Sequence, residues 1–219
     1  MFLHGYLSSK EAFAAQIAYF SKFYRVTALD FLGFGHSRYL TSAFSVGDYA
    51  DWLLDVLAAL KVEKPHVIAH SFGCRVAVKA AGEKGDVFDK ILLTGPAGVI
   101  LNRGFAYRVK VRTYRIVKKI FPRFAERRFG SEEYRSLSPI MKESYKKIVN
   151  EDLREAAARV QSEVLIVQGT EDFVTTRAEA EAYLERFPHG SMKTIEGGHF
   201  AFAENPVAFN LIAEEFLYG

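Results

Sequence analysis

Three side chains able to act as nucleophile, acid and base occur in the order Ser71, Asp172 and His199, each after a short apolar run. A serine hydroxyl is a poor nucleophile until a base removes its proton, and that base needs a third group to orient it. Ser71 stands within Ala69–Gly73, between an expected strand and an expected helix. A serine on such an elbow adopts a strained conformation that exposes its hydroxyl. The pattern predicts attack by Ser71 on a carbonyl carbon, and the alternative is an ordinary loop serine.

The expected partners of this serine follow later strands. Asp172 comes after the fourth expected strand, and His199 follows the last one within a glycine loop. Because parallel strands end at the same edge of a sheet, we expect both side chains to meet Ser71 there. Glu171 is the rival acid, and we rank it below Asp172 on its position in the loop.

Acyl chemistry also needs N–H donors for the oxyanion that develops, and each donor contributes about 3 kcal/mol. The backbone N–H of Phe72, which directly follows the nucleophile, is one candidate donor. The N–H of Tyr6, directly after Gly5, is the second candidate. We expect His4 to hold this N-terminal loop in shape without acting as a base.

The elements that must position these residues alternate between apolar strands and helices. Strand runs that are apolar throughout are typical of a parallel sheet covered on both faces. Alternation of this kind predicts right-handed βαβ units, an open doubly wound α/β sheet and one domain over residues 1–219. The expected strands are 23–29, 65–70, 90–94, 164–168 and 191–195, and the expected helices are 10–19, 46–60, 75–81, 178–187 and 206–217.

A basic, mainly helical insertion interrupts the alternation over residues 100–160. Between Arg103 and Lys147 the chain has 14 Lys or Arg and four Glu, a net charge of +10 within a chain of net charge +3. We interpret the insertion as a cap over the carboxyl edge of the sheet, where such sheets bind ligands. We expect its charges on solvated helix faces, with weak attraction to an anionic membrane surface or an anionic substrate as the alternative. No nucleic-acid-binding module accompanies the charge, so no nucleic-acid partner is expected.

The composition excludes several classes of protein. The 219 residues are 49% hydrophobic and 25% charged, which excludes a disordered chain. A single cysteine, Cys74, excludes a disulfide framework, and we interpret it as a buried packing residue. The histidines lack metal-ligand spacing, so we expect neither metal nor cofactor. Neither a membrane-spanning run of about 18 apolar residues nor a secretion signal is present, so we expect a cytoplasmic protein.

The chain resembles proteins of the α/β-hydrolase fold over essentially its whole length. The landmarks that match in order are Leu3–Gly5, Asp30–Ser37, the Ser71 elbow, Gly169–Asp172 and Gly198–His199. This resemblance implies that Ser71 is the nucleophile, Asp172 the orienting acid and His199 the general base.

The resemblance also implies a hairpin ahead of the His–Gly loop, whereas only Met1–Leu3 precede it here. Without a hairpin, the expected strand 23–29 would leave an unprotected sheet edge. Either this strand pairs with its counterpart in a homodimer, or about 20–40 further residues upstream supply the hairpin. We favour the upstream segment.

Together these observations predict a cofactor-independent serine hydrolase that cleaves a small carboxylic ester or related acyl substrate through an acyl-enzyme. Two alternatives stay open. Carbon–carbon hydrolases of the same fold, which act on dienone-type substrates, resemble the chain in size and cap but usually have Trp where Phe200 stands. A non-catalytic ligand-binding relative is the other alternative, and the missing hairpin argues for it.

Overall fold

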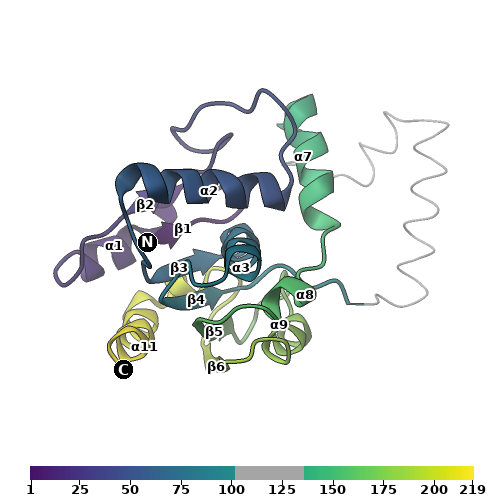
Figure 1. Cartoon of the computed structure of the whole chain (residues 1–219). Helices are drawn as coiled ribbons and strands as arrows, with labels where there is room; N and C mark the ends of the chain where they lie inside the picture. The colour runs from purple at the N-terminus through teal and green to yellow at the C-terminus, as the bar shows by residue number, and fades with distance from the viewer. Residues whose placement is uncertain (102–135) are drawn as a thin grey trace.

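The computed structural model describes residues 1–101 and 136–219. These residues form a six-stranded sheet in the order β2-β1-β3-β4-β5-β6, in which every neighbouring pair is parallel (Figure 1). The expected doubly wound α/β fold is confirmed. The strands are β1 (Phe2–Leu3), β2 (Ala28–Leu29), β3 (Val67–His70), β4 (Lys90–Thr94), β5 (Glu163–Gly169) and β6 (Gly190–Ile195).

Helices cover both faces of the sheet, which explains why its strands are apolar throughout. In β4, Ile91 and Leu93 join one core cluster, while Leu92 between them joins the other. The first cluster packs the sheet against α2, α3 and α9, and the second packs it against α1 and α11. The helices are α1 (Ala14–Phe20), α2 (Val46–Leu60), α3 (Phe72–Lys84), α7 (Pro139–Val149), α8 (Arg154–Ala157), α9 (Arg177–Leu184), α10 (Ala201–Glu204) and α11 (Pro206–Tyr218).

The order in which successive strands are added to the sheet reverses between β1 and β3. After β1 the chain crosses to β2 at the edge, and it then returns to β3 on the other side of β1. Ligands of open α/β sheets bind beyond the carboxyl ends of the strands at such a reversal. Gly5 follows β1 and Ser71 follows β3, so both lie at this point.

Some element boundaries differ from the sequence prediction. β2 was expected over residues 23–29 but contains only Ala28–Leu29, because β1, its partner in the sheet, has only two residues. The helix expected from residue 75 begins at Phe72, directly after Ser71. The expected first helix is divided, with a 3-10 turn over Lys10–Phe13 ahead of α1. By contrast, α2 has its expected bounds.

Most of the expected cap, residues 102–135, lies outside the described residues, as do the side chains expected on its inner face. Two helices of the predicted insertion are described, α7 and α8. The Ser138 hydroxyl caps α7 by accepting the N–H of Met141 at 3.2 Å. Among the described helices, we find none with the length and apolar content needed to cross a bilayer.

Candidate active site

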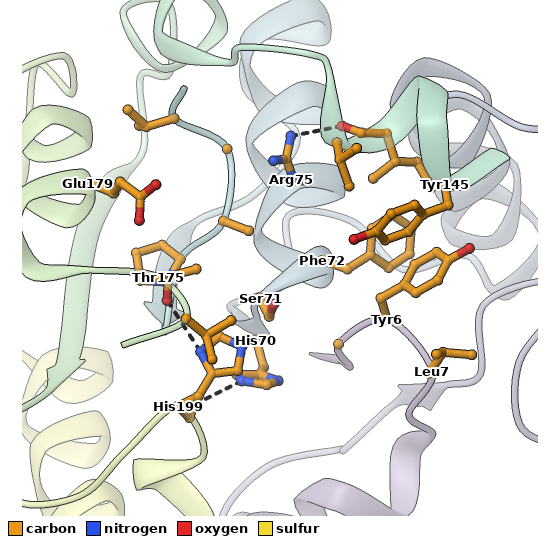
Figure 2. A pocket seen from close by; sticks show the side chains of 18 of the residues that line it. Tyr6, Leu7, His70, Ser71, Phe72, Arg75, Tyr145, Thr175, Glu179 and His199 are labelled. Carbon is orange, nitrogen blue, oxygen red and sulfur yellow. Dashed lines mark hydrogen bonds between the residues drawn. The ribbon is translucent and has the colours of Figure 1, made fainter. Parts of the chain in front are cut away.

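Ser71 occupies a strained turn between β3 and α3. Its backbone has φ 48° and ψ −104°, a conformation that residues with a side chain rarely adopt. A Cβ at Gly73 would overlap the carbonyl oxygen of Leu3 and crowd that of His4, so only glycine lets α3 approach the end of β1. The Ser71 hydroxyl forms no hydrogen bond with any residue in the described ranges, and it faces a pocket at the carboxyl edge of the sheet (Figure 2).

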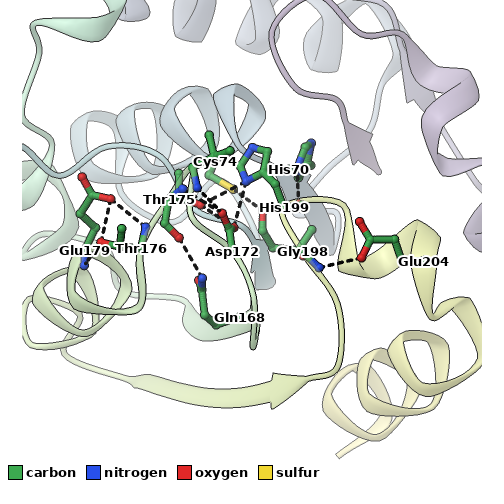
Figure 3. Close-up of polar contacts among 12 residues, drawn as sticks. His70, Cys74, Gln168, Asp172, Thr175, Thr176, Glu179, Gly198, His199 and Glu204 are labelled. Carbon is green, nitrogen blue, oxygen red and sulfur yellow. Dashed lines mark hydrogen bonds and ion pairs between the residues drawn. The ribbon is translucent and has the colours of Figure 1, made fainter.

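Asp172 and His199 form a hydrogen-bonded pair at the pocket that Ser71 faces. The Nδ1 of His199 lies 2.9 Å from Oδ2 of Asp172 (Figure 3). The Asp172 side chain is fully buried, and the His199 side chain is 12% exposed. Because the carboxylate can only accept, Nδ1 carries the proton and Nε2 is left as a proton acceptor. His199 and Ser71 line the same pocket.

The Asp172 carboxylate is held in place by the turn that follows it. Its Oδ1 accepts the N–H groups of Val174 and Thr175, both at 2.9 Å, and its Oδ2 accepts the Thr175 hydroxyl at 2.8 Å. Burial opposes the ionisation of Asp172, but the hydrogen bonds from His199 and Thr175 outweigh it and hold the pKa of this carboxyl below its usual value. The carboxylate therefore stays charged opposite His199.

The rival acid, Glu171, forms no hydrogen bond with His199 within the described residues. Glu171 is exposed, and its backbone N–H donates to the carbonyl oxygen of Gly197 at 2.9 Å. This bond ties the Asp172 loop to the His199 loop. Of the two acids weighed from the sequence, the structure brings Asp172 to His199.

The two candidate oxyanion donors border the same pocket as Ser71. Phe72 is the first residue of α3, so its N–H has no acceptor within the helix. Gly5 and Tyr6 line the pocket from the loop after β1. The Tyr6 ring packs edge-on against Phe72 with centroids 5.6 Å apart, and its hydroxyl donates to the carbonyl oxygen of Met141 in α7 at 3.2 Å.

His4 ties the N-terminal loop to the segment after β2. The Phe31 N–H donates to Nε2 of His4 at 3.0 Å, so the proton is on Nδ1, which donates to the carbonyl oxygen of Gly5 at 2.7 Å. Burial lowers the pKa of His4 and keeps the ring neutral. Both ring nitrogens are used in shaping the loop, which is the role expected from the sequence.

Sequence reasoning missed His70 as part of the site. Its Nε2 donates to the carbonyl oxygen of His199 at 3.0 Å, and the two rings lie 4.7 Å apart. Burial lowers the pKa of His70 to about 3, so the ring is neutral. Its position directly before Ser71 was the signal that could have identified it.

Gly95, just after β4, is a second residue that the sequence did not indicate. It has φ +51°, and a Cβ there would lie 3.0 Å from Nδ1 of His199 and 3.2 Å from Oδ2 of Asp172. The absence of a side chain at Gly95 thus makes room for the Asp172–His199 pair. Its signal in the sequence was a glycine at a strand end.

Cys74, the third residue of α3, is fully buried. Its thiol donates to the carbonyl oxygen of Ala69 at 3.2 Å, and burial raises the pKa of the thiol well above its usual value. A buried, protonated thiol is a packing residue, as the sequence analysis interpreted it.

One group of candidate metal ligands was not expected from the sequence. In the described ranges, ligand atoms of Glu11, Asp30 and His36 lie within 4.8 Å of one another. The ammonium group of Lys10 lies 2.7 Å from Oδ2 of Asp30 and 3.3 Å from Oε1 of Glu11. Lys10 therefore supplies a positive charge to these carboxylates. None of the four residues borders the Ser71 pocket.

Comparison with known proteins identifies the family. A family model described as "Alpha/beta hydrolase family" matches residues 1–210. The chain belongs to the alpha/beta hydrolase family. The expected resemblance to proteins of the α/β-hydrolase fold is therefore confirmed.

Among curated proteins, the chain is similar to the probable lysophospholipase BODYGUARD 3 of Arabidopsis thaliana. The two are 30% identical over 129 residues, which is 56% of this chain and 25% of the relative. This chain matches only 25% to 34% of the length of three curated relatives.

Two solved structures show the same fold. An esterase from Exiguobacterium antarcticum has a TM-score of 0.78 and 19% identity, covering 100% of this chain and 91% of the esterase. A meta-cleavage product hydrolase from Pseudomonas fluorescens has a TM-score of 0.75 and 22% identity, covering 99% of this chain and 89% of that hydrolase. At these identities the likeness concerns the fold alone.

Proposed function

We propose that this alpha/beta hydrolase is a cofactor-independent serine hydrolase that cleaves a carboxylic ester or related acyl substrate. Ser71 is the nucleophile, His199 the general base and Asp172 the acid that orients it. The observation that carries the proposal is the 2.9 Å hydrogen bond between Asp172 and His199 in the pocket that Ser71 faces. A carboxylate that fixes Nδ1 leaves Nε2 of the imidazole to accept the serine proton.

The proposed reaction has two halves. His199 takes the proton of Ser71 through Nε2 while the serine oxygen attacks the ester carbonyl, and it then gives that proton to the leaving alcohol. The acyl group remains on Ser71 as an ester. His199 next removes a proton from water while the water oxygen attacks the acyl carbon, and it returns that proton to the Ser71 oxygen as the bond to the acyl group breaks and the acid leaves. Asp172 stabilises the imidazolium in both halves without taking its proton.

The N–H groups of Tyr6 and Phe72 are the proposed oxyanion donors. Phe72 is supported by its position as the first residue of α3, where the helix dipole also favours negative charge. Tyr6 is supported by its place in the loop that borders the same pocket. The rings of these two residues also pack against each other.

Covalent labelling with a fluorophosphonate tests the proposal. The probe reacts with an activated serine, so the wild type should be labelled and Ser71→Ala should not. Ser8 also lines the pocket, and Ser8→Ala is the matched control that should keep full labelling. Failure of the folded wild type to react would contradict the proposal and favour the non-catalytic ligand-binding alternative.

Carbon–carbon hydrolysis is the second candidate reaction. It needs the same three residues, and the structural likeness to a meta-cleavage product hydrolase concerns the fold alone. A screen of p-nitrophenyl esters of increasing chain length alongside a dienone-type substrate distinguishes the two. We expect the esters to be turned over faster, and turnover of the dienone alone would contradict ester hydrolysis as the function.

A further inference from the structure

A charged side chain of α3, that of Arg75, lines the pocket that Ser71 faces. Arg75 lies one helical turn beyond Ser71, is only 8% exposed and lines the pocket (Figure 2). Side chains on a helix lean toward its N-terminus, so Arg75 leans toward the Ser71 end of α3. The pocket therefore contains a largely buried guanidinium group close to the serine.

Only part of this guanidinium group has a structural partner. Its Nη1 donates to the carbonyl oxygens of Ile148 at 3.0 Å and Glu151 at 2.8 Å, at the carboxyl end of α7. In residues 1–101 and 136–219, neither Nε nor Nη2 has a hydrogen-bond acceptor. A guanidinium group offers five N–H donors in a planar fork that matches a carboxylate or phosphate.

No carboxylate in the described ranges forms an ion pair with Arg75, although acids lie nearby. The carboxylate of Glu151 pairs with Lys79 at 2.7 Å, and that of Asp152 pairs with Arg154 at 2.8 Å. Glu179, on the pocket wall, uses Oε2 to accept the N–H and the hydroxyl of Thr176 at the start of α9. These acids are engaged with other groups.

Burying a charge is costly, and burial lowers the pKa of Arg75, although the charges of Glu151 and Asp152 partly oppose this shift. The helix end at Ile148 offsets part of the cost, because cations are favoured at the carboxyl end of a helix. If Arg75 served only to hold the carboxyl end of α7, its Nη1 would be sufficient, because Nη1 makes both of the hydrogen bonds to that end. The unused side of the guanidinium group is what a ligand would use.

We propose that Arg75 binds an anionic group, a carboxylate or a phosphate, on the acyl part of the substrate. This inference rests on the proposed hydrolase function. His199 must protonate the leaving alcohol, so the alcohol part lies on the His199 side of Ser71. Figure 2 shows Arg75 and His199 on opposite sides of Ser71, which places the acyl part toward Arg75. The substrate class is thus an ester whose acyl chain ends in an anion.

Three p-nitrophenyl esters with the same acyl length test the proposal. One acyl chain ends in a carboxylate, one in a phosphonate and one in a neutral methyl ester. Wild type should prefer an anionic ester, and Arg75→Met should lower kcat/KM for that ester about 10- to 100-fold, the effect of one lost charged hydrogen-bonding partner. The kcat/KM for the neutral ester should change little. Whichever of the carboxylate and phosphonate esters wild type cleaves faster shows which kind of anion Arg75 prefers.

Two variants separate binding from structure and from net charge. Arg75→Lys keeps the charge and should retain part of the preference for an anionic ester. Arg177→Met removes an equal charge from an exposed ion pair with Glu181 and should leave the preference unchanged. An equal loss for charged and neutral esters in Arg75→Met would mean that Arg75 only supports α7, and the proposal would be wrong.

Measuring ligand binding to an inactive variant tests the Arg75 site independently of catalysis. Ser71→Ala should bind monomethyl glutarate at least about tenfold more tightly than dimethyl glutarate in calorimetry, and adding Arg75→Met should abolish the difference. If wild type hydrolyses none of the esters but this difference is seen, the hydrolase proposal fails while the anion site stands. Equal binding of the two ligands to Ser71→Ala would contradict the anion site itself.

Discussion

Thr175 binds both oxygens of the Asp172 carboxylate, with its N–H 2.9 Å from Oδ1 and its hydroxyl 2.8 Å from Oδ2. The same hydroxyl lies 3.3 Å from Nδ1 of His199. Oδ2 is the oxygen that accepts the hydrogen bond from Nδ1 of His199, so Thr175 contacts both members of this hydrogen bond (Figure 3). A carboxylate held at three points has one orientation, and that orientation fixes the imidazole.

Removing the Thr175 hydroxyl should therefore weaken catalysis without disturbing the fold. Thr175→Val keeps the N–H bond to Oδ1 but loses the donor to Oδ2, and we expect kcat to fall about tenfold with little change in KM. Thr175→Ser retains a hydroxyl and should restore most of the activity. Equal kcat values for Thr175→Val and wild type would show that the backbone bonds alone orient Asp172.

The choice of acid can be tested by paired amide substitutions. Asp172→Asn should lower kcat about 10⁴-fold, because an amide can donate to Nδ1 and so favours the wrong tautomer of His199. Glu171→Gln should retain near wild-type activity, since Glu171 is exposed. Steady-state kinetics on one ester would settle the choice, and a larger loss in Glu171→Gln would reverse the assignment.

Gly95 and Gly85 both have a positive φ, but only Gly95 lies next to His199. Substituting each by alanine therefore distinguishes the effect of backbone strain from the effect of displacing His199. Gly95→Ala would place a Cβ 3.0 Å from Nδ1 of His199, whereas a Cβ at Gly85, with φ +74°, meets nothing within 4 Å. Both substitutions should destabilise the protein by about 1–2 kcal/mol. Only Gly95→Ala should also lower kcat/KM, by about 100-fold, because it displaces His199. Similar activity of the two folded variants would contradict this account.

Asp30 should make the stability of the protein depend on acid pH. Burial opposes its ionisation, but hydrogen bonds from Lys10 and the His36 N–H outweigh it and hold the pKa of the Asp30 carboxyl well below its usual value. The stabilisation is complete above the unfolded-state pKa of about 4 and is lost as the pH falls toward the lower folded-state value.

Urea unfolding of wild type and Asp30→Asn at neutral and acid pH measures this contribution. The difference in unfolding free energy should be about 2 kcal/mol at neutral pH and should shrink below about pH 4. Asp86→Asn breaks an exposed ion pair with Lys64 and should have little effect at either pH. A constant difference between wild type and Asp30→Asn across the range would show that Asp30 does not titrate with folding.

The sequence predicted those features of the site that depend on local pattern. Ser71 lies between an apolar strand run and a helix with small residues at its start, and both signals are local. Asp172 and His199 each follow an apolar run, and parallel strands bring their ends together. The pairing of Asp172 with His199 requires only that the two strands end at the same edge of the sheet. Both residues could therefore be predicted as partners from the sequence alone.

What the sequence did not indicate depends on contacts between distant segments. Thr175 and His70 take their roles from the position of His199, 24 and 129 residues away along the chain. Within the described residues, Arg75 is seen to lack an ion-pair partner only once Glu151 and Asp152 are found paired with Lys79 and Arg154. The length of β2 depends on β1, because a strand ends where its partner ends.

Our central claim is that Ser71 and His199 act as one catalytic unit, and a double-mutant comparison of kcat/KM on one ester tests it most directly. Ser71→Ala and His199→Ala should each lower kcat/KM by about 10⁴-fold or more while the protein stays folded by circular dichroism. The double variant should be no worse than either single variant, because a base without its nucleophile has nothing to activate. Near wild-type activity of Ser71→Ala, or losses that multiply in the double variant, would contradict the claim.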